Sequence, residues 1–225
     1  MQIKDSVVFV TGANRGFGRE LAAQLLERGA AKVYAGARNP DSVDLPGVVP
    51  VRIDITDPES IAQAAALAPD TTILINNAGV STHADLLTGD WADIRLEMEV
   101  HYFGTLGTAR AFAPVITGNV GGAILNVLSV LSWLHVPPYG AYSAAKAASW
   151  AATDVVRQQL APSGIAVTAL HVGYMDTDMA NYVPKDDKTD PAKVAALALD
   201  GIEAGAAEVL GDDRSAQVKA GLSAA

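Results

Sequence analysis

The segment YGAYSAAK, residues 139–146, carries a phenol and an ammonium group at a spacing that could do proton-transfer chemistry. Tyr142 and Lys146 are four residues apart, so in a helix they lie on the same face, one turn apart. A free tyrosine, with a pKa of about 10, is poorly matched to neutral pH, and a nearby ammonium group favours its charged form. The pattern indicates either an acid–base pair or a surface helix whose Tyr and Lys are only neighbours.

A glycine-rich turn, TGANRGFG, follows the first β-branched run and contains Gly12, Gly16 and Gly18. Glycine lets backbone N–H groups approach a pyrophosphate closely, and the helix that starts there adds its positive dipole end. The G-x-x-x-G-x-G spacing differs from the better-known G-x-G-x-x-G. The turn alone therefore fits either a dinucleotide site or an ordinary tight turn.

Charged residues at the ends of the next two strand-like runs bear on the choice of dinucleotide. NAD sites usually have a carboxylate after the second strand, but this chain has Ala37-Arg38 there. Arg38 and Arg15 can pair with the 2′-phosphate of NADP(H), or they are two solvated surface arginines. Asp54 could accept a hydrogen bond from the adenine amino group or help to cap the following helix.

The elements that must position these residues alternate along the chain. Strand-like runs are expected at 7–10, 32–37, 47–53, 72–76, 122–129, 165–171 and 207–210, and helices at 16–28, from Asp57-Pro58, and at 88–100, 101–117, 140–160 and 191–204. Continuous apolar strands are typical of a parallel sheet covered on both faces. We expect an α/β fold with a doubly wound, Rossmann-like, seven-stranded parallel sheet, in one domain over 1–225. The irregular segment 172–190 is the expected substrate lid.

Composition limits the classes of function. The 225 residues are 50% apolar and include no cysteine, which excludes disulfides and a Cys nucleophile, and the four histidines have no metal-ligand spacing, so no metal is expected. A net charge of −9 without a basic cluster argues against binding to nucleic acid. With no signal-like N-terminus and no run long enough to span a bilayer, we expect a cytoplasmic protein without a membrane partner.

Ligands of such sheets bind beyond the carboxyl ends of the strands, where NNAG (76–79) and Ser129 also lie. TGANRGFG, NNAG, the spacing from Ser129 to YSAAK and the strand order together resemble the short-chain dehydrogenase/reductase family, in its single-domain branch. The resemblance covers essentially the whole chain. It implies that Tyr142 is the proton donor and acceptor and that Ser129 hydrogen-bonds the substrate carbonyl. Lys146 would bind the nicotinamide ribose and stabilise a tyrosinate, with Ser132 as a secondary contact.

The resemblance also implies an NADP(H) site. Its residues would be Gly12, Asn14, Arg15, Gly16, Phe17, Gly18, Arg38, Asp54, Ile55, Asn77, Ala78, Gly79, Tyr142, Lys146 and Thr177. Thr177 matches the family segment that contacts the carboxamide, with a capping turn as the alternative. The chain departs from the family in two places: His101 stands where an Asn is usual, and Val172-Gly173 replaces Pro-Gly. We expect His101 to alter the proton relay and to titrate near neutral pH, or to pack passively against its helix.

The expected substrate pocket is largely apolar and aromatic. It comprises Leu131, Trp133, Leu134, His135, Tyr139, Tyr174, Met175, Met179 and Tyr182. Such a wall favours small hydrophobic carbonyl or alcohol substrates. The predicted function is an NADPH-dependent, reversible carbonyl reductase. The alternatives are a weakened NADPH-binding or sensing protein and an NAD-dependent alcohol dehydrogenase. The alanine-rich helix 140–160 predicts a homodimer or homotetramer; His83 is expected to be exposed and His171 packed.

Overall fold

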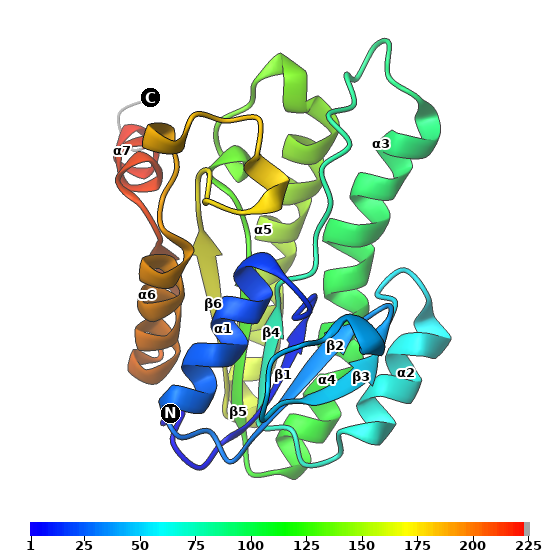
Figure 1. The fold of residues 1–225 in the computed structure, drawn as a ribbon, viewed down its shortest axis with the longest axis vertical. Helices are drawn as coiled ribbons and strands as arrows, with labels where there is room; N and C mark the ends of the chain where they lie inside the picture. The colour runs from blue at the N-terminus through cyan, green and yellow to red at the C-terminus, as the bar shows by residue number, and fades with distance from the viewer. Residues whose placement is uncertain (223–225) are drawn as a thin grey trace.

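The computed structural model describes residues 1–222, and its centre is a sheet of seven parallel strands (Figure 1). The strands are β1 (Val7–Thr11), β2 (Lys32–Ala37), β3 (Val49–Arg52), β4 (Ile73–Asn76), β5 (Gly122–Val127), β6 (Ile165–His171) and β7 (Glu208–Leu210). Their order is β3-β2-β1-β4-β5-β6-β7, so the chain winds outward in both directions from β1 and β4. This confirms the expected doubly wound sheet.

Helices cover both faces of the sheet. They are α1 (Gly16–Glu27), α2 (Pro58–Leu67), α3 (Trp91–Met98), α4 (Thr105–Gly118), α5 (Gly140–Leu160), α6 (Pro191–Ala204) and α7 (Asp213–Leu222). Residues of α1 and α6 share one apolar core with the strands, and residues of α2 and α4 share the other. The central strands are buried between these layers, which explains why their sequences are continuous apolar runs.

Two features differ from the sequence-based expectation. The helices expected at 88–100 and 101–117 are one continuous helical path, because a π-helical segment over Glu99–Gly104 joins α3 to α4. Helix α7 was not expected at all. The predicted start of α2 is confirmed, since the Asp57 side chain accepts a hydrogen bond from the Glu59 N–H at 2.9 Å and Pro58 occupies the first helical turn.

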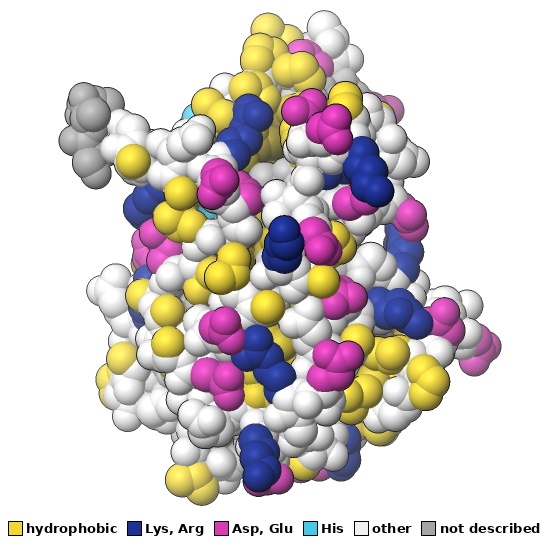
Figure 2. All heavy atoms as spheres, turned by 60° about the vertical axis from the view of Figure 1, so that its left-hand side comes forward, with side chains coloured by type: hydrophobic (Ala, Val, Ile, Leu, Met, Phe, Trp, Pro, Cys, Tyr) yellow, Lys and Arg dark blue, Asp and Glu magenta, His cyan; other side chains and the backbone are white. Residues whose placement is uncertain are grey.

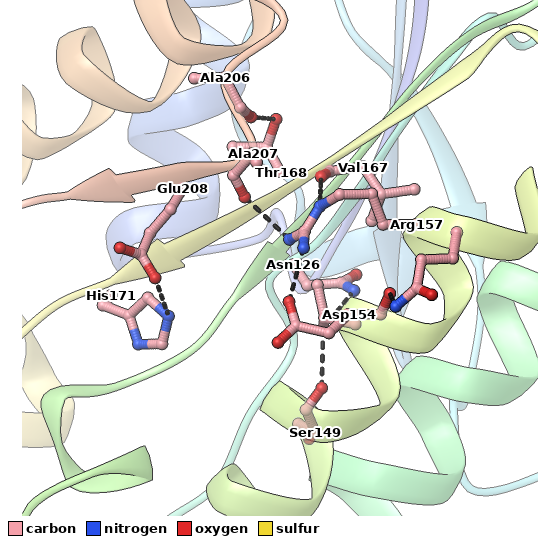
Figure 3. A network of polar contacts seen from close by, with 12 residues as sticks. Asn126, Ser149, Asp154, Arg157, Val167, Thr168, His171, Ala206, Ala207 and Glu208 are labelled. Atoms are coloured by element: carbon pink, nitrogen blue, oxygen red, sulfur yellow. Dashed lines mark hydrogen bonds and ion pairs between the residues drawn. The ribbon is translucent and has the colours of Figure 1, made fainter. Parts of the chain in front are cut away.

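A polar network fixes α5 against the edge of the sheet (Figure 3). The Arg157 guanidinium donates from Nε to the Val167 carbonyl at 2.7 Å and from Nη2 to the Ala207 carbonyl at 2.8 Å. The Asp154 carboxylate accepts a third bond from Nη1, at 2.5 Å. Because these bonds tie the C-terminal half of α5 to β6 and to the residue before β7, they also fix its N-terminal half, which carries Tyr142 and Lys146.

The surface has mixed charge. On the face drawn in Figure 2, acidic and basic side chains are interspersed over the described part of the chain, without a continuous basic patch. Within residues 1–222, no helix is both long and apolar enough to cross a membrane.

Candidate active site

A cavity of about 700 Å³ opens beyond the carboxyl ends of the strands. All the residues that the resemblance assigned to the cofactor line it, as do Ser129 and His101. The cavity also takes in seven of the nine expected substrate-pocket residues: Leu131, Leu134, Tyr139, Tyr174, Met175, Met179 and Tyr182. Segments far apart in the sequence therefore meet around one site.

The loop after β5 and the first turns of α5 bring Ser129, Tyr142 and Lys146 together. Ser129 and Tyr142 both line the cavity, and Ser129 is near enough to the Tyr142 phenol to lower its pKa. Lys146 lies one turn further along α5, with its Nζ 5.6 Å from the centre of the Tyr142 ring. That Nζ donates a hydrogen bond to the Val127 carbonyl at 2.8 Å, so the ammonium group is anchored to the end of β5. The arrangement has a proton donor, a second hydroxyl and a fixed cation in one place.

Burial dominates the acid–base properties of this group. It raises the pKa of Tyr142 well above the ordinary value, although Ser129 acts in the opposite direction. Burial also lowers the pKa of Lys146 to about 8, against the attraction of Glu97. The sequence predicts that the ammonium group favours a tyrosinate, but burial is the largest influence on the Tyr142 pKa and acts the other way. Tyr142 is therefore protonated at neutral pH and able to donate a proton.

His101 lies in the π-helical segment, next to the catalytic phenol. Its ring meets the Tyr142 ring edge to face, with centroids 5.0 Å apart. The imidazole is only 2% exposed, and burial, together with the charge of Lys146, lowers its pKa below the ordinary value. The expectation that His101 titrates near neutral pH is therefore wrong, because the buried ring is neutral there and gains a proton only at lower pH.

Glu97 is a site residue that the sequence analysis missed. It is fully buried, and its Oε2 lies 3.2 Å from Nε2 of His101. The available signal was the spacing of Glu97 and His101 in EMEVH, which is four residues and hence one helical face. Because no partner of either residue can be identified from the sequence, that signal does not distinguish a buried pair from a solvated one.

The glycine turn is shaped for close backbone approach. Gly12 has φ +67°, and a Cβ on Gly18 would lie 2.2 Å from the Gly12 carbonyl oxygen. The Asn77 amide donates to the carbonyls of Thr11 at 2.9 Å and of Gly12 at 3.2 Å, which ties the turn to the end of β4. Helix α1 starts after Arg15 without a side-chain cap, so its first N–H groups remain available to an anion.

The far end of the cavity is lined by Ala37, Arg38, Asn39 and Ser42. Arg38 makes no ion pair among the described residues, whereas Arg15 has an exposed contact of 3.5 Å with Asp178. The Asp54 carboxylate accepts hydrogen bonds from the Thr56 N–H at 3.0 Å and hydroxyl at 2.7 Å. Asp54 thus holds its own turn while lining the cavity, and the cap of α2 is Asp57 instead.

Segment 172–190 lies over the cavity and is tied down at several points. Lys188 pairs with Asp176 at 2.7 Å. The Tyr174 hydroxyl donates to Tyr139 at 3.1 Å, and the Tyr139 hydroxyl donates to Tyr182 at 3.2 Å. Thr177 approaches the glycine turn, with its side chain 3.7 Å from where a Cβ on Gly16 would lie. This segment therefore connects the cofactor end of the cavity with the expected substrate end.

Two expected pocket residues lie elsewhere. Trp133 is buried and stacks on His171, with ring centroids 3.7 Å apart, and His135 is exposed; neither lines the cavity. Ser132 is also directed away, since its hydroxyl donates to the Ser129 carbonyl and faces His171. The short helical turn after Ser129 explains these placements, because it rotates neighbouring side chains to different sides. His83 is exposed and His171 buried, as expected.

Comparisons with known proteins agree with this geometry. A family model described as short chain dehydrogenase matches residues 6–188. Dehydrogenase/reductase SDR family member 7B of Xenopus tropicalis is 30% identical, over 88% of this chain and 74% of its own length. An uncharacterized oxidoreductase of Staphylococcus aureus is 33% identical, over 88% of this chain and 90% of its own. The crystal structure of a short chain dehydrogenase from Burkholderia cenocepacia in complex with NADP has a TM-score of 0.95 and 44% identity, covering 100% of this chain and 95% of that one.

Proposed function

The chain belongs to the short-chain dehydrogenase family of oxidoreductases, and on that premise we propose that it is an NADPH-dependent carbonyl reductase. The observation that carries the proposal is the meeting of Ser129, Tyr142 and Lys146 at one end of a cavity whose other end presents Arg15 and Arg38. The apolar side chains that line the cavity favour a hydrophobic ketone or aldehyde as substrate. They include Leu131, Leu134, Met175 and Met179.

The residues present fit an NADP(H) molecule. Gly12 and Gly18 allow a turn too tightly packed to admit a Cβ, both line the cavity, and α1 starts beside them without a side-chain cap. Arg38, with no acidic residue at the end of β2, suits a 2′-phosphate better than a 2′-hydroxyl. A similar protein from Burkholderia cenocepacia was crystallised with NADP, which supports this choice. When bound, the nicotinamide supplies a hydride to the carbonyl carbon.

The protein's own residues then handle the oxygen and its proton. Ser129 Oγ and Tyr142 Oη can both hydrogen-bond the substrate oxygen, since both residues line the same cavity. Tyr142 is protonated at neutral pH and donates its proton to that oxygen as negative charge develops there. The Lys146 cation favours the resulting tyrosinate until it regains a proton. We further propose that segment 172–190 acts as the lid that excludes water.

Cofactor choice is tested at Arg38. If Arg38 pairs with the 2′-phosphate, Arg38→Asp removes a charge-assisted contact of about 2 kcal/mol, equivalent to about thirtyfold in NADPH affinity. We expect the ratio of kcat/KM for NADPH over NADH to fall by at least that factor in assays with a panel of hydrophobic ketones. Arg110→Asp, on the exposed surface of α4, is the control. An unchanged ratio would refute the 2′-phosphate assignment, and no turnover with any ketone would refute the reductase.

A further inference from the structure

Glu97 is the only residue of α3 that is buried. The rest of this short helix is exposed or half-buried, so an apolar residue would be the ordinary choice at its one inward position. A carboxylate that leaves water loses its hydration and is stable in the interior only with partners close by. The position of this carboxylate, one turn before His101, calls for a functional explanation.

The contacts of Glu97 divide between its two oxygens. Oε1 accepts hydrogen bonds from the Thr82 N–H at 2.6 Å and from the Thr82 hydroxyl at 2.9 Å. Oε2 lies 3.2 Å from Nε2 of His101, at ion-pair distance, and has no hydrogen-bond partner among residues 1–222. Although burial alone would raise the pKa of Glu97, the bonds from His101 and Thr82 hold it below the ordinary value. Glu97 is therefore a carboxylate at neutral pH.

These contacts determine which nitrogen of His101 carries the proton. Nε2 lies 2.9 Å from the Val80 carbonyl oxygen and 3.2 Å from Oε2 of Glu97. Both of these neighbours only accept hydrogen bonds, so Nε2 must be the protonated nitrogen of the neutral ring. The other nitrogen, Nδ1, is then an acceptor. His101 lines the cavity and its ring is edge-on to Tyr142, so this acceptor belongs to a ring that borders the catalytic group.

The charge of Glu97 also acts on the other groups of the site. It raises the pKa of Tyr142 and that of Lys146, and it opposes the lowering of the pKa of His101 by burial and by Lys146. The remaining titratable groups that face Tyr142 are Tyr174 and Tyr182 from segment 172–190, and both act on it in the same direction as Glu97. Glu97 is the one carboxylate among them, so it is the countercharge of Lys146.

We propose that Glu97 is a positioning residue of the proton relay, which holds His101 in the Nε2–H form with Nδ1 ready to accept a proton and keeps Lys146 charged. The inference rests on the proposed reductase function, because the relay serves to reprotonate Tyr142. A carboxylate that orients a histidine in this way acts through the tautomer and the charge of the ring, as in the Asp–His pair of serine proteases. An Asn side chain at this position would have no tautomer to fix and would not need Glu97. Because His101 stands there instead, the relay needs a residue that orients its ring.

The test replaces Glu97 by Gln, with Glu99→Gln as the matched control, because Glu99 is exposed two residues further along. The Gln amide keeps the size of the side chain but removes its charge and can offer N–H groups to Nε2. In the protein without added cofactor, ¹⁵N NMR of the imidazole rings should show His101 as Nε2–H in the parent and in the control. His101→Asn identifies its signals among the four histidines. In Glu97→Gln only the Val80 carbonyl still requires Nε2–H, so the Nδ1–H form should gain population.

The kinetic arm uses the holoenzyme with NADPH and a ketone. Glu97→Gln should lower kcat at least about tenfold, within the range of acid–base contributions. Its alkaline inflection should move to lower pH, because loss of the carboxylate lowers the pKa of Lys146 further. In the His101→Asn background, the effect of Glu97→Gln on kcat should largely disappear, since Glu97 would then have no ring to orient.

The outcomes separate the two proposals. An Nε2–H signal and a pH profile that both survive in Glu97→Gln would overturn the positioning role. An equal loss of kcat in the parent and His101→Asn backgrounds, with an unmoved alkaline inflection, would overturn it as well, because it would mark Glu97 as a purely structural residue. A parent without ketone turnover would refute the reductase, while the NMR arm would still decide the tautomer. If Glu97→Gln does not fold, Glu97→Asp keeps the charge but shortens the side chain and withdraws the carboxylate from His101, and an unchanged His101 spectrum and kcat there would count against the proposal.

Discussion

Lys146 is the residue whose charge sets the alkaline limit of the proposed reaction. Its pKa of about 8 means that the side chain is an ammonium group below that pH and becomes neutral above it. Since the cation stabilises the tyrosinate left after proton donation, kcat for ketone reduction should be level near neutral pH. It should fall about tenfold for each pH unit well above 8, as expected for one titrating group.

The check is a pH profile of kcat with saturating NADPH, with cofactor binding followed over the same range by fluorescence. Loss of kcat with intact binding is the expected result. A profile level to pH 10 would show that Lys146 keeps its proton through the catalytic cycle. The acidic side offers a second observation, because His101, with a pKa below its ordinary value, should cause no inflection near neutral pH.

At the scale of single residues, the sequence predicts which side chains take part in the chemistry better than it predicts their surroundings. Tyr142, Lys146 and Ser129 could be predicted because a four-residue spacing and a strand end position them by local geometry alone. The raised pKa of Tyr142 could not, since it depends on burial by segments distant in the sequence. Glu97 was missed for the same reason: a Glu in an amphipathic-looking helix ordinarily faces water.

Among the elements, the glycine turn leads to the most specific prediction about stability and NADPH binding. A Cβ on Gly18 would lie 2.2 Å from the Gly12 carbonyl oxygen and 2.4 Å from Asn77 Nδ2, so Gly18→Ala must displace the turn. We expect a loss of about 1–3 kcal/mol in the free energy of unfolding, as for other overpacked sites. NADPH affinity should fall at least about tenfold. Thermal unfolding with and without NADPH measures both.

Gly118→Ala is the matched control for this substitution. Gly118 is in α4, and a Cβ there would meet nothing within 4 Å. Alanine is the better helix former by up to about 1 kcal/mol, so this variant should be unchanged or slightly stabilised. If Gly18→Ala behaved like the control, the turn would not be the tightly packed cradle that the cofactor site requires.

Regular elements were predicted well where the apolar pattern is strong, as in β1, β5, α5 and α6. The sequence predicts two separate helices where α3 and α4 are joined, because hydrophobic periodicity does not reveal a π-helical turn. The extra residue of that turn rotates His101 toward the site. Helix α7 was not predicted because its sequence is short and polar. Trp133 and His135 were assigned to the pocket from their place between Ser129 and Tyr142, but a 3₁₀ turn there directs side chains both ways.

At the scale of the whole molecule, exposed small and apolar side chains on α5 and on the π-helical segment Glu99–Gly104 lead us to predict self-association. Ala144 and Ala151 are exposed along α5, and Phe103 and Val155 are each 52% exposed on the adjoining helical surfaces. Small residues allow helices of two copies to approach closely, and exposed apolar side chains would be buried there. Light scattering at micromolar concentration should give the mass of a homodimer or homotetramer, and Ala151→Glu should lower it. A parent of 23.2 kDa by mass would be a monomer and would contradict the prediction.

The central claim, that this site reduces a carbonyl with NADPH and a proton from Tyr142, is tested most directly by isotope transfer. A hydrophobic ketone is incubated with NADPH that carries deuterium at both hydrogen positions of nicotinamide C4, and the alcohol is analysed by mass spectrometry. We predict one deuterium on the carbinol carbon. Tyr142→Phe should bind NADPH normally but form product at least about a hundredfold more slowly, because it lacks the donated proton. NADPH consumption without deuterium in the alcohol, or an undiminished rate in Tyr142→Phe, would contradict the account.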